Sequence, residues 1–81
     1  MDDRDILSRV DRLVAEEHEL RTRHLAGQLT DAEEQDRLKQ VEESLDQCWD
    51  LLRQRRALRD AGQNPDAAQA RPPSEVEGYL Q

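Results

Sequence analysis

The heptapeptide GQLTDAE, residues 27–33, decides the fold of this 81-residue chain. Gly27 supplies a residue that adopts the left-handed backbone conformation with which helices commonly end. The stretch Thr30-Asp31-Ala32-Glu33 then has the pattern of a capping box, in which the threonine hydroxyl and the glutamate carboxylate satisfy free amides at a helix start. Because one helix stops where the next begins, the two helices are predicted to fold back antiparallel.

An apolar stripe of helical period extends to each side of this turn. Before the turn it consists of Ile6, Val10, Leu13 and Leu20, and after it of Leu38, Val41, Leu45, Cys48 and Leu52. Such a period is typical of helices that bury one narrow seam. We therefore expect an all-α, coiled-coil-like hairpin with helices at about residues 3–26 and 31–61. Gly62 ends the second helix, and residues 62–81 form a mostly irregular, proline-containing tail.

Alignment of the two stripes outward from the turn fixes their register. Leu20 then faces Leu38, Leu13 faces Leu45, Val10 faces Cys48, and Ile6 faces Leu52. The same register brings the acidic start of the chain, Asp2, Asp3 and Asp5, beside Arg53, Arg55, Arg56 and Arg59. Opposite charges are thus predicted to meet at the open end of the hairpin.

The open end also carries more apolar side chains than one hairpin can bury. Those that flank the seam are Leu7, Val14, Trp49, Leu51 and Leu58. Because a two-helix unit buries one face of each helix, these residues need another partner. We expect a second copy, which gives an antiparallel four-helix bundle with two-fold symmetry.

Composition excludes several classes of protein. The net charge of −7 opposes non-specific binding to nucleic acid or anionic lipid. No apolar run approaches the roughly 18 residues of a membrane span, and the acidic start is unlike a signal peptide, so a cytoplasmic location is expected. The sequence has no glycine-rich phosphate loop and no catalytic triad, and we predict neither enzymatic activity nor a cofactor.

The cysteine and the two histidines have simple structural interpretations. Cys48 falls on the buried stripe, as expected of a cysteine that acts as a small core residue; an intermolecular disulfide and a catalytic or metal-binding role are the alternatives. His18 and His24 lie near the turn, where solvated or capping roles fit them. We predict no metal site.

The acidic turn, Asp31, Glu33 and Glu34, has one functional alternative. It loosely resembles the acidic tip of the coiled-coil hairpins with which some bacterial transcription factors hold a metal ion in the polymerase secondary channel. Carboxylates in the first turn of a helix also stabilise it without any function.

Two further segments are candidate partner contacts. Arg53, Arg55, Arg56 and Arg59 form the one basic cluster, which could contact nucleic acid or the transcription machinery, although the surrounding acids also explain it. In the tail, Asn64 and Pro65 predict a short helical turn up to Ala70. Val76, Tyr79 and Leu80 form a small apolar cluster that either folds back over Trp49 or binds elsewhere.

Three motifs make the chain resemble a family of short actinobacterial helical proteins that is described as a domain of unknown function. They are LDQCWDLLRQRR at residues 45–56, the opening Asp5-Ile6-Leu7 with VAEEH at 14–18, and the closing VEGYLQ at 76–81. The resemblance implies a complete chain with an integral tail, and it transfers no activity or ligand. The sequence thus favours a small interaction module that self-associates at its open end.

Overall fold

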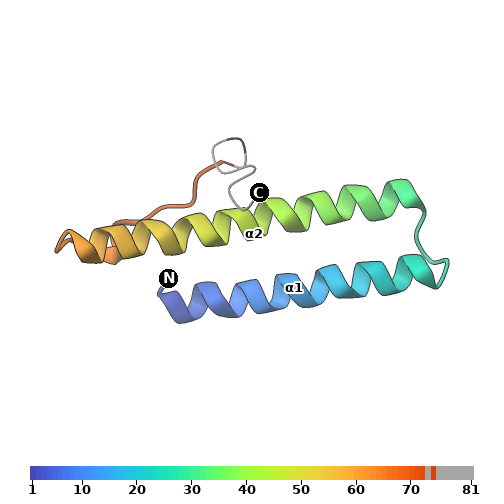
Figure 1. The fold of residues 1–81 in the computed structure, drawn as a ribbon, viewed down its shortest axis with the longest axis horizontal. Coiled ribbons are helices and arrows are strands. Elements are labelled where there is room, and N and C mark those ends of the chain that lie inside the picture. The colour runs from blue at the N-terminus through green and yellow to red at the C-terminus, as the bar shows by residue number, and fades with distance from the viewer. Residues whose placement is uncertain (73, 75–81) are drawn as a thin grey trace.

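The computed structural model describes residues 1–72 and residue 74. The helical elements given for this part of the chain are α1 at Asp3–Leu25, α2 at Asp31–Asp60, and the short 3-10 turn η1 at Pro65–Ala67. α1 and α2 lie side by side and antiparallel (Figure 1). The all-α hairpin predicted from the sequence is confirmed, and each long helix ends one residue earlier than expected.

Local signals place each end of the two long helices. Asp2 and Thr30 cap the starts of α1 and α2, and each forms a reciprocal capping box with the residue three positions on. Gly27 and Gly62 follow the two C-caps with φ of 76° and 71°. The amides of Gln28 and Gln63 then donate to the carbonyls of Arg23 and Leu58, which completes a Schellman motif at both ends.

The seam between the helices contains two clusters of buried residues. Ile6, Val10 and Cys48 form the cluster toward the open end, with Leu13, Leu45, Trp49, Leu51 and Leu52 packed against it. Leu20, Leu29 and Val41 form the cluster toward the turn. This grouping agrees with the predicted register. Leu29 is a core residue that the stripe analysis missed, because it lies in the loop rather than on a helix.

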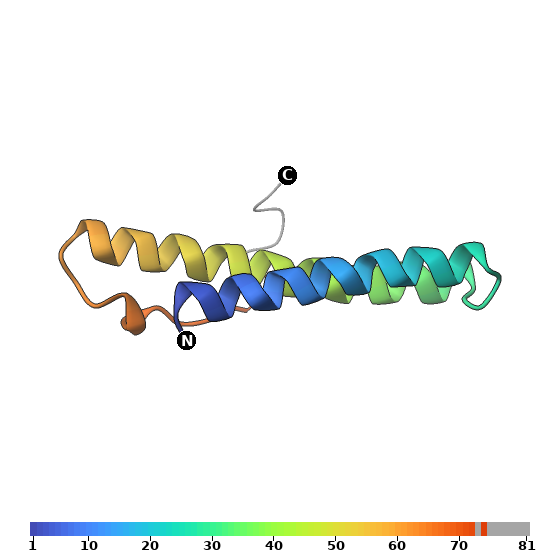
Figure 2. The same ribbon diagram turned by 90° about the horizontal axis from the view of Figure 1, so that it is seen from below.

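After α2 the chain reverses and runs back toward the amino terminus (Figure 2). Asn64 caps η1 by accepting a hydrogen bond from the amide of Asp66. The predicted short turn in this segment is therefore present, but it ends at Ala67 instead of Ala70. The apolar cluster of Val76, Tyr79 and Leu80 lies outside the described residues.

Thr30→Ala is expected to destabilise the protein by about 1 kcal/mol, because it leaves the amide of Glu33 without its side-chain acceptor. The control is Thr22→Ala, since the Thr22 hydroxyl bonds only to a carbonyl of its own helix. Urea titrations followed by circular dichroism measure both changes. Equal stabilities for the two variants would show that the capping box contributes nothing.

Candidate interaction site

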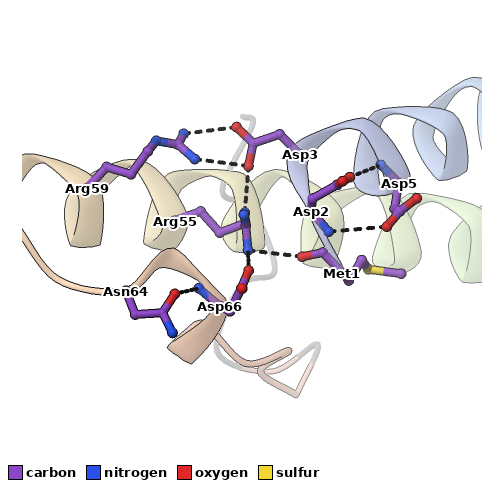
Figure 3. Close-up of polar contacts among 8 residues, drawn as sticks. All are labelled: Met1, Asp2, Asp3, Asp5, Arg55, Arg59, Asn64 and Asp66. Atoms are coloured by element: carbon purple, nitrogen blue, oxygen red, sulfur yellow. Dashed lines mark hydrogen bonds and ion pairs between the residues drawn. The ribbon is translucent and has the colours of Figure 1, made fainter.

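The open end of the hairpin is closed by a polar network around Arg55 (Figure 3). The Arg55 Nε donates to Asp3 Oδ1 at 2.5 Å, and its Nη1 donates to Asp66 Oδ1 at 2.8 Å and to the Met1 carbonyl at 2.9 Å. Arg59 donates to both carboxylate oxygens of Asp3. The network ties together the start of α1, the last turns of α2, and η1.

The charges in this network stabilise one another. Hydrogen bonds from Arg59 and Arg55 lower the pKa of Asp3, and the bond from Arg55 lowers the pKa of Asp66. The two carboxylates raise the pKa of Arg55 in return. The predicted meeting of acidic start and basic cluster is therefore present in the structure.

The same geometry removes Arg55 from the candidate partner contacts. Its side chain is 8% exposed, and its donors are directed at three groups of the same chain. Arg59 is 43% exposed but is paired with Asp3. Arg55 and Arg59, two of the four arginines in the basic cluster, are thus part of the fold, because the register puts the Asp3 carboxylate within hydrogen-bond reach of both.

The five apolar residues predicted to mediate self-association do not share one flank. Leu7, Val14 and Trp49 each come one position after a seam residue, Ile6, Leu13 and Cys48 respectively. Leu51 comes one position before the seam residue Leu52, and Leu58 lies two turns beyond Leu51. Since one position turns the helix by about 100°, Trp49 and Leu51 project from opposite flanks of α2.

The side chains one position past the seam emerge on the same side of both helices, because the helices are antiparallel and of the same hand. Leu7, Val14 and Trp49 therefore make up one apolar flank, here called the Trp49 flank. Leu7 and Val14 are 46% and 52% exposed, and Trp49 is half-buried. The Trp49 flank is the candidate interaction surface of the hairpin.

The opposite flank, that of Leu51, is covered by the returning tail. A cavity of about 310 Å³ lies there between α1, α2 and the tail. Its lining consists of Met1, Ile6, Arg9, Leu51, Arg55, Asp66, Ala68 and Ala70. Leu51 thus faces the tail of its own chain, whereas Leu7 and Val14 are exposed to solvent.

Asp50 is the residue of this region that sequence reasoning missed. Its carboxylate is fully buried, although it lies about 200° around α2 from the seam residue Cys48. The Arg71 guanidinium binds both of its oxygens and Gln54 donates to one of them. The hydrogen bonds from Arg71 lower the pKa of this carboxyl despite its burial. No local sequence signal links residues 50 and 71, so the pair could not be found from the pattern.

The cysteine near the open end and the titratable residues at the turn have contacts that fit structural roles. Cys48 is 2% exposed among aliphatic side chains, and burial raises the pKa of its thiol, which suits a core residue rather than a nucleophile. His24 Nε2 lies 2.5 Å from Asp31 Oδ1, across the turn. Glu33 belongs to the capping box, where the Thr30 amide and hydroxyl lower its pKa. Within residues 1–72, no group of three metal-binding side chains comes together.

None of the described helices is long and apolar enough to cross a membrane.

Comparison with known proteins assigns the chain to a family. The family model with the description "Protein of unknown function (DUF2630)" matches residues 2–81. Two relatives are "Uncharacterized protein Rv0898c" of Mycobacterium tuberculosis and "Uncharacterized protein Mb0922c" of Mycobacterium bovis. Each is 51% identical over 77 residues, which cover 95% of this chain and 88% of the relative. No solved structure matches the chain. The hairpin with its returning tail therefore belongs to the DUF2630 family, as the resemblance of its motifs implied.

Proposed function

We propose that this protein is a small, non-catalytic interaction module that self-associates through the Trp49 flank. The observation that carries the proposal is the exposure of Leu7 and Val14 beside a half-buried Trp49. Apolar side chains grouped on one flank favour association, because a partner removes them from water. A cytoplasmic location is part of the same proposal and rests on the expectations from composition.

The partner that fits this flank is a second copy, which would complete a four-helix bundle. The register puts Trp49 at a level along the hairpin between Leu7 and Val14. A two-fold axis near this level would pack the flank of one copy on that of the other. Both copies of each side chain would then be buried. Leu51 and Leu58 are not part of this surface, since they lie on the opposite flank.

Val14→Glu is expected to weaken the dimer at least about tenfold, because two-fold symmetry places the buried charge in the interface twice. Sedimentation equilibrium of the full chain at tens of micromolar measures the association. The matched control is Ala15→Glu, which introduces the same charge at the next exposed position of α1, away from the flank. The emission of Trp49, the single tryptophan, gives a second signal, since dilution into monomer should shift it to longer wavelength.

Two results contradict the proposal. One is a wild-type chain that sediments as a monomer at tens of micromolar, with Trp49 emitting as an exposed indole. The other is an equal effect of Val14→Glu and Ala15→Glu, which would place the interface elsewhere.

The alternative function, contact with nucleic acid or the transcription machinery through Arg53, Arg55, Arg56 and Arg59, has less support. Arg55 and Arg59 already pair with Asp3, and the net charge of −7 opposes a polyanion. A mobility-shift assay with duplex DNA and with RNA tests it, and binding that Arg56→Gln reduces would favour it over self-association.

A further inference from the structure

Side chains of α2 hydrogen-bond to residues 69–71 of the tail, which return along that helix: Gln47, Asp50 and Gln54. Gln47, Asp50 and Gln54 are three and four positions apart, so they share one face of α2. The face is distinct from the Trp49 flank, since Asp50 lies about 100° further around the helix than Trp49. Here Gln47, Asp50 and Gln54 are called the Asp50 face.

Two of these side chains bind the backbone of the tail. The Gln54 amide nitrogen donates to the Gln69 carbonyl at 2.8 Å, and the Gln54 carbonyl accepts from the Gln69 amide at 3.4 Å. The Gln47 amide donates to the Arg71 carbonyl at 2.9 Å. Because main-chain groups are common to all residues, these contacts recognise an irregular or extended segment without regard to most of its sequence.

The third side chain of the face specifies arginine. The Asp50 carboxylate accepts from Nε and Nη2 of Arg71 through its two different oxygens, which is the bidentate arrangement of arginine with a carboxylate. The Asp50 side chain is 1% exposed while the Arg71 side chain is 47% exposed. A lysine cannot reproduce both bonds, because its ammonium is a single point of charge.

The tail fills the space beside this face incompletely. Ala68 and Ala70 are the tail's small side chains on the cavity of about 310 Å³, whose opposite walls include Ile6 and Leu51. Arg9, Arg55 and Asp66 also line this cavity, so its walls are partly charged and partly apolar, and a larger side chain from the tail would cover the apolar part. A segment with a larger aliphatic side chain at the position of Ala70 would fill this space and bind more tightly.

We propose that the Asp50 face is a peptide-binding site for an extended segment of a partner protein. The segment carries an arginine preceded by a bulky aliphatic residue, and the chain's own residues 69–71 occupy the site in its absence. The chemistry of the occupant follows from the buried carboxylate, the two glutamines and the unfilled cavity. The inference concerns a different surface from the one proposed for self-association and does not depend on it.

The test uses the full-length chain with Arg71→Gln, which frees Asp50 from its internal cation, and a fluorescent nonapeptide. The peptide has the sequence of residues 66–74 with leucine in place of Ala70, and fluorescence anisotropy measures its binding. We expect the variant to bind at least about tenfold more tightly than the wild-type chain, whose tail competes from within the molecule. We also expect a peptide that retains alanine at this position to bind several-fold more weakly.

Control variants and a control peptide test whether binding is specific to the Asp50 face. Asp50→Asn added to the Arg71→Gln chain should abolish binding, whereas Asp36→Asn, the same change at an exposed position of α2, should leave it unaltered. A peptide with glutamine in place of the arginine should not bind. Equal binding of the arginine and glutamine peptides, or of the wild-type and Arg71→Gln chains, would overturn the proposal.

A second measurement covers the case in which Arg71→Gln fails to fold. Excess leucine peptide added to the wild-type chain should shift the side-chain amide resonances of Gln47 and Gln54, together with the backbone resonances of Gln69. Unshifted resonances would contradict the proposal. A wild-type dimer that Arg71→Gln dissociates would also contradict it, because the occupant would then be the tail of a second copy.

Discussion

Ile6→Ala is expected to destabilise the protein by about 2–5 kcal/mol, the largest effect of any single substitution considered for it. Ile6 is 1% exposed and packs with Val10 and Cys48 in the cluster nearest the open end. It also lies on the cavity beside the tail, so the deleted methyl groups enlarge a space that is already unfilled. Since a chain of this size is stable by roughly 4–12 kcal/mol, the loss is a large share of the total.

The measurement is chemical unfolding in urea, followed by circular dichroism at one fixed protein concentration, because dimerisation makes the apparent stability depend on concentration. Leu25→Ala is the matched control. It removes a side chain of the same size from the same helix, but one that is 86% exposed, so its effect should stay within about 0.5 kcal/mol. If Ile6→Ala were no more harmful than Leu25→Ala, the open-end cluster would not hold the hairpin together.

The second large effect is a loss of stability in acid. The carboxyls of Asp3, Asp50 and Asp66 have pKa values lowered by hydrogen bonds from arginines, and Glu33 has one lowered by the Thr30 amide and hydroxyl. A carboxyl with a lowered pKa stabilises the folded state above its unfolded pKa, and the contribution disappears as pH falls through the folded value. The protein should therefore lose stability below about pH 4.

Several parts of the molecule should fail together in this range. Protonation of Asp3 leaves Arg55 and Arg59 as neighbouring positive charges, and protonation of Asp50 frees Arg71 and with it the tail. Thermal unfolding is followed by circular dichroism at about pH 7, 4 and 2.5. The midpoint temperature of unfolding should fall between about pH 4 and about pH 2.5. A midpoint that is constant or rises between the two lower values would contradict the role of these ion pairs.

Asp3→Asn separates this effect from the general change of charge. The variant should be less stable than wild type at neutral pH, because it keeps one hydrogen-bonding oxygen but loses the charge that holds two guanidinium groups. Its stability should then depend less on pH through the acid range, since one of the responsible carboxyls is absent. Asp11→Asn, the same change at an exposed position of α1, should retain the wild-type dependence.

The helices and their ends were predictable because their signals are local. The capping box at residues 30–33, the glycines that follow each helix and the seam of helical period each act within a few residues, and the helix ends predicted from the sequence lie within one residue of those observed. The register also followed from the seam, so the meeting of Asp3 with Arg55 could be predicted. What the pattern missed nearby was Leu29, a loop residue that belongs to no period.

The flanks of the hairpin were less predictable. Composition showed that the open end has surplus apolar side chains, but it did not show that Leu51 faces the returning tail while Leu7 and Val14 face solvent. It also offered Arg55 to a partner, although Asp3, Asp66 and the Met1 carbonyl occupy its donors. The helical period gives the direction in which each side chain leaves its helix. It does not show whether another segment of the chain packs against that side chain.

The sequence by itself thus determined the hairpin, its register and the charge pairing at its open end, since these follow from contacts between neighbours along the chain or along the seam. Only the tertiary structure decided that the tail covers one flank, that Asp50 is buried beneath Arg71, and that Leu7 and Val14 are exposed. The first two features join residues some twenty positions apart through an irregular segment, and irregular backbone has no period from which its path can be inferred.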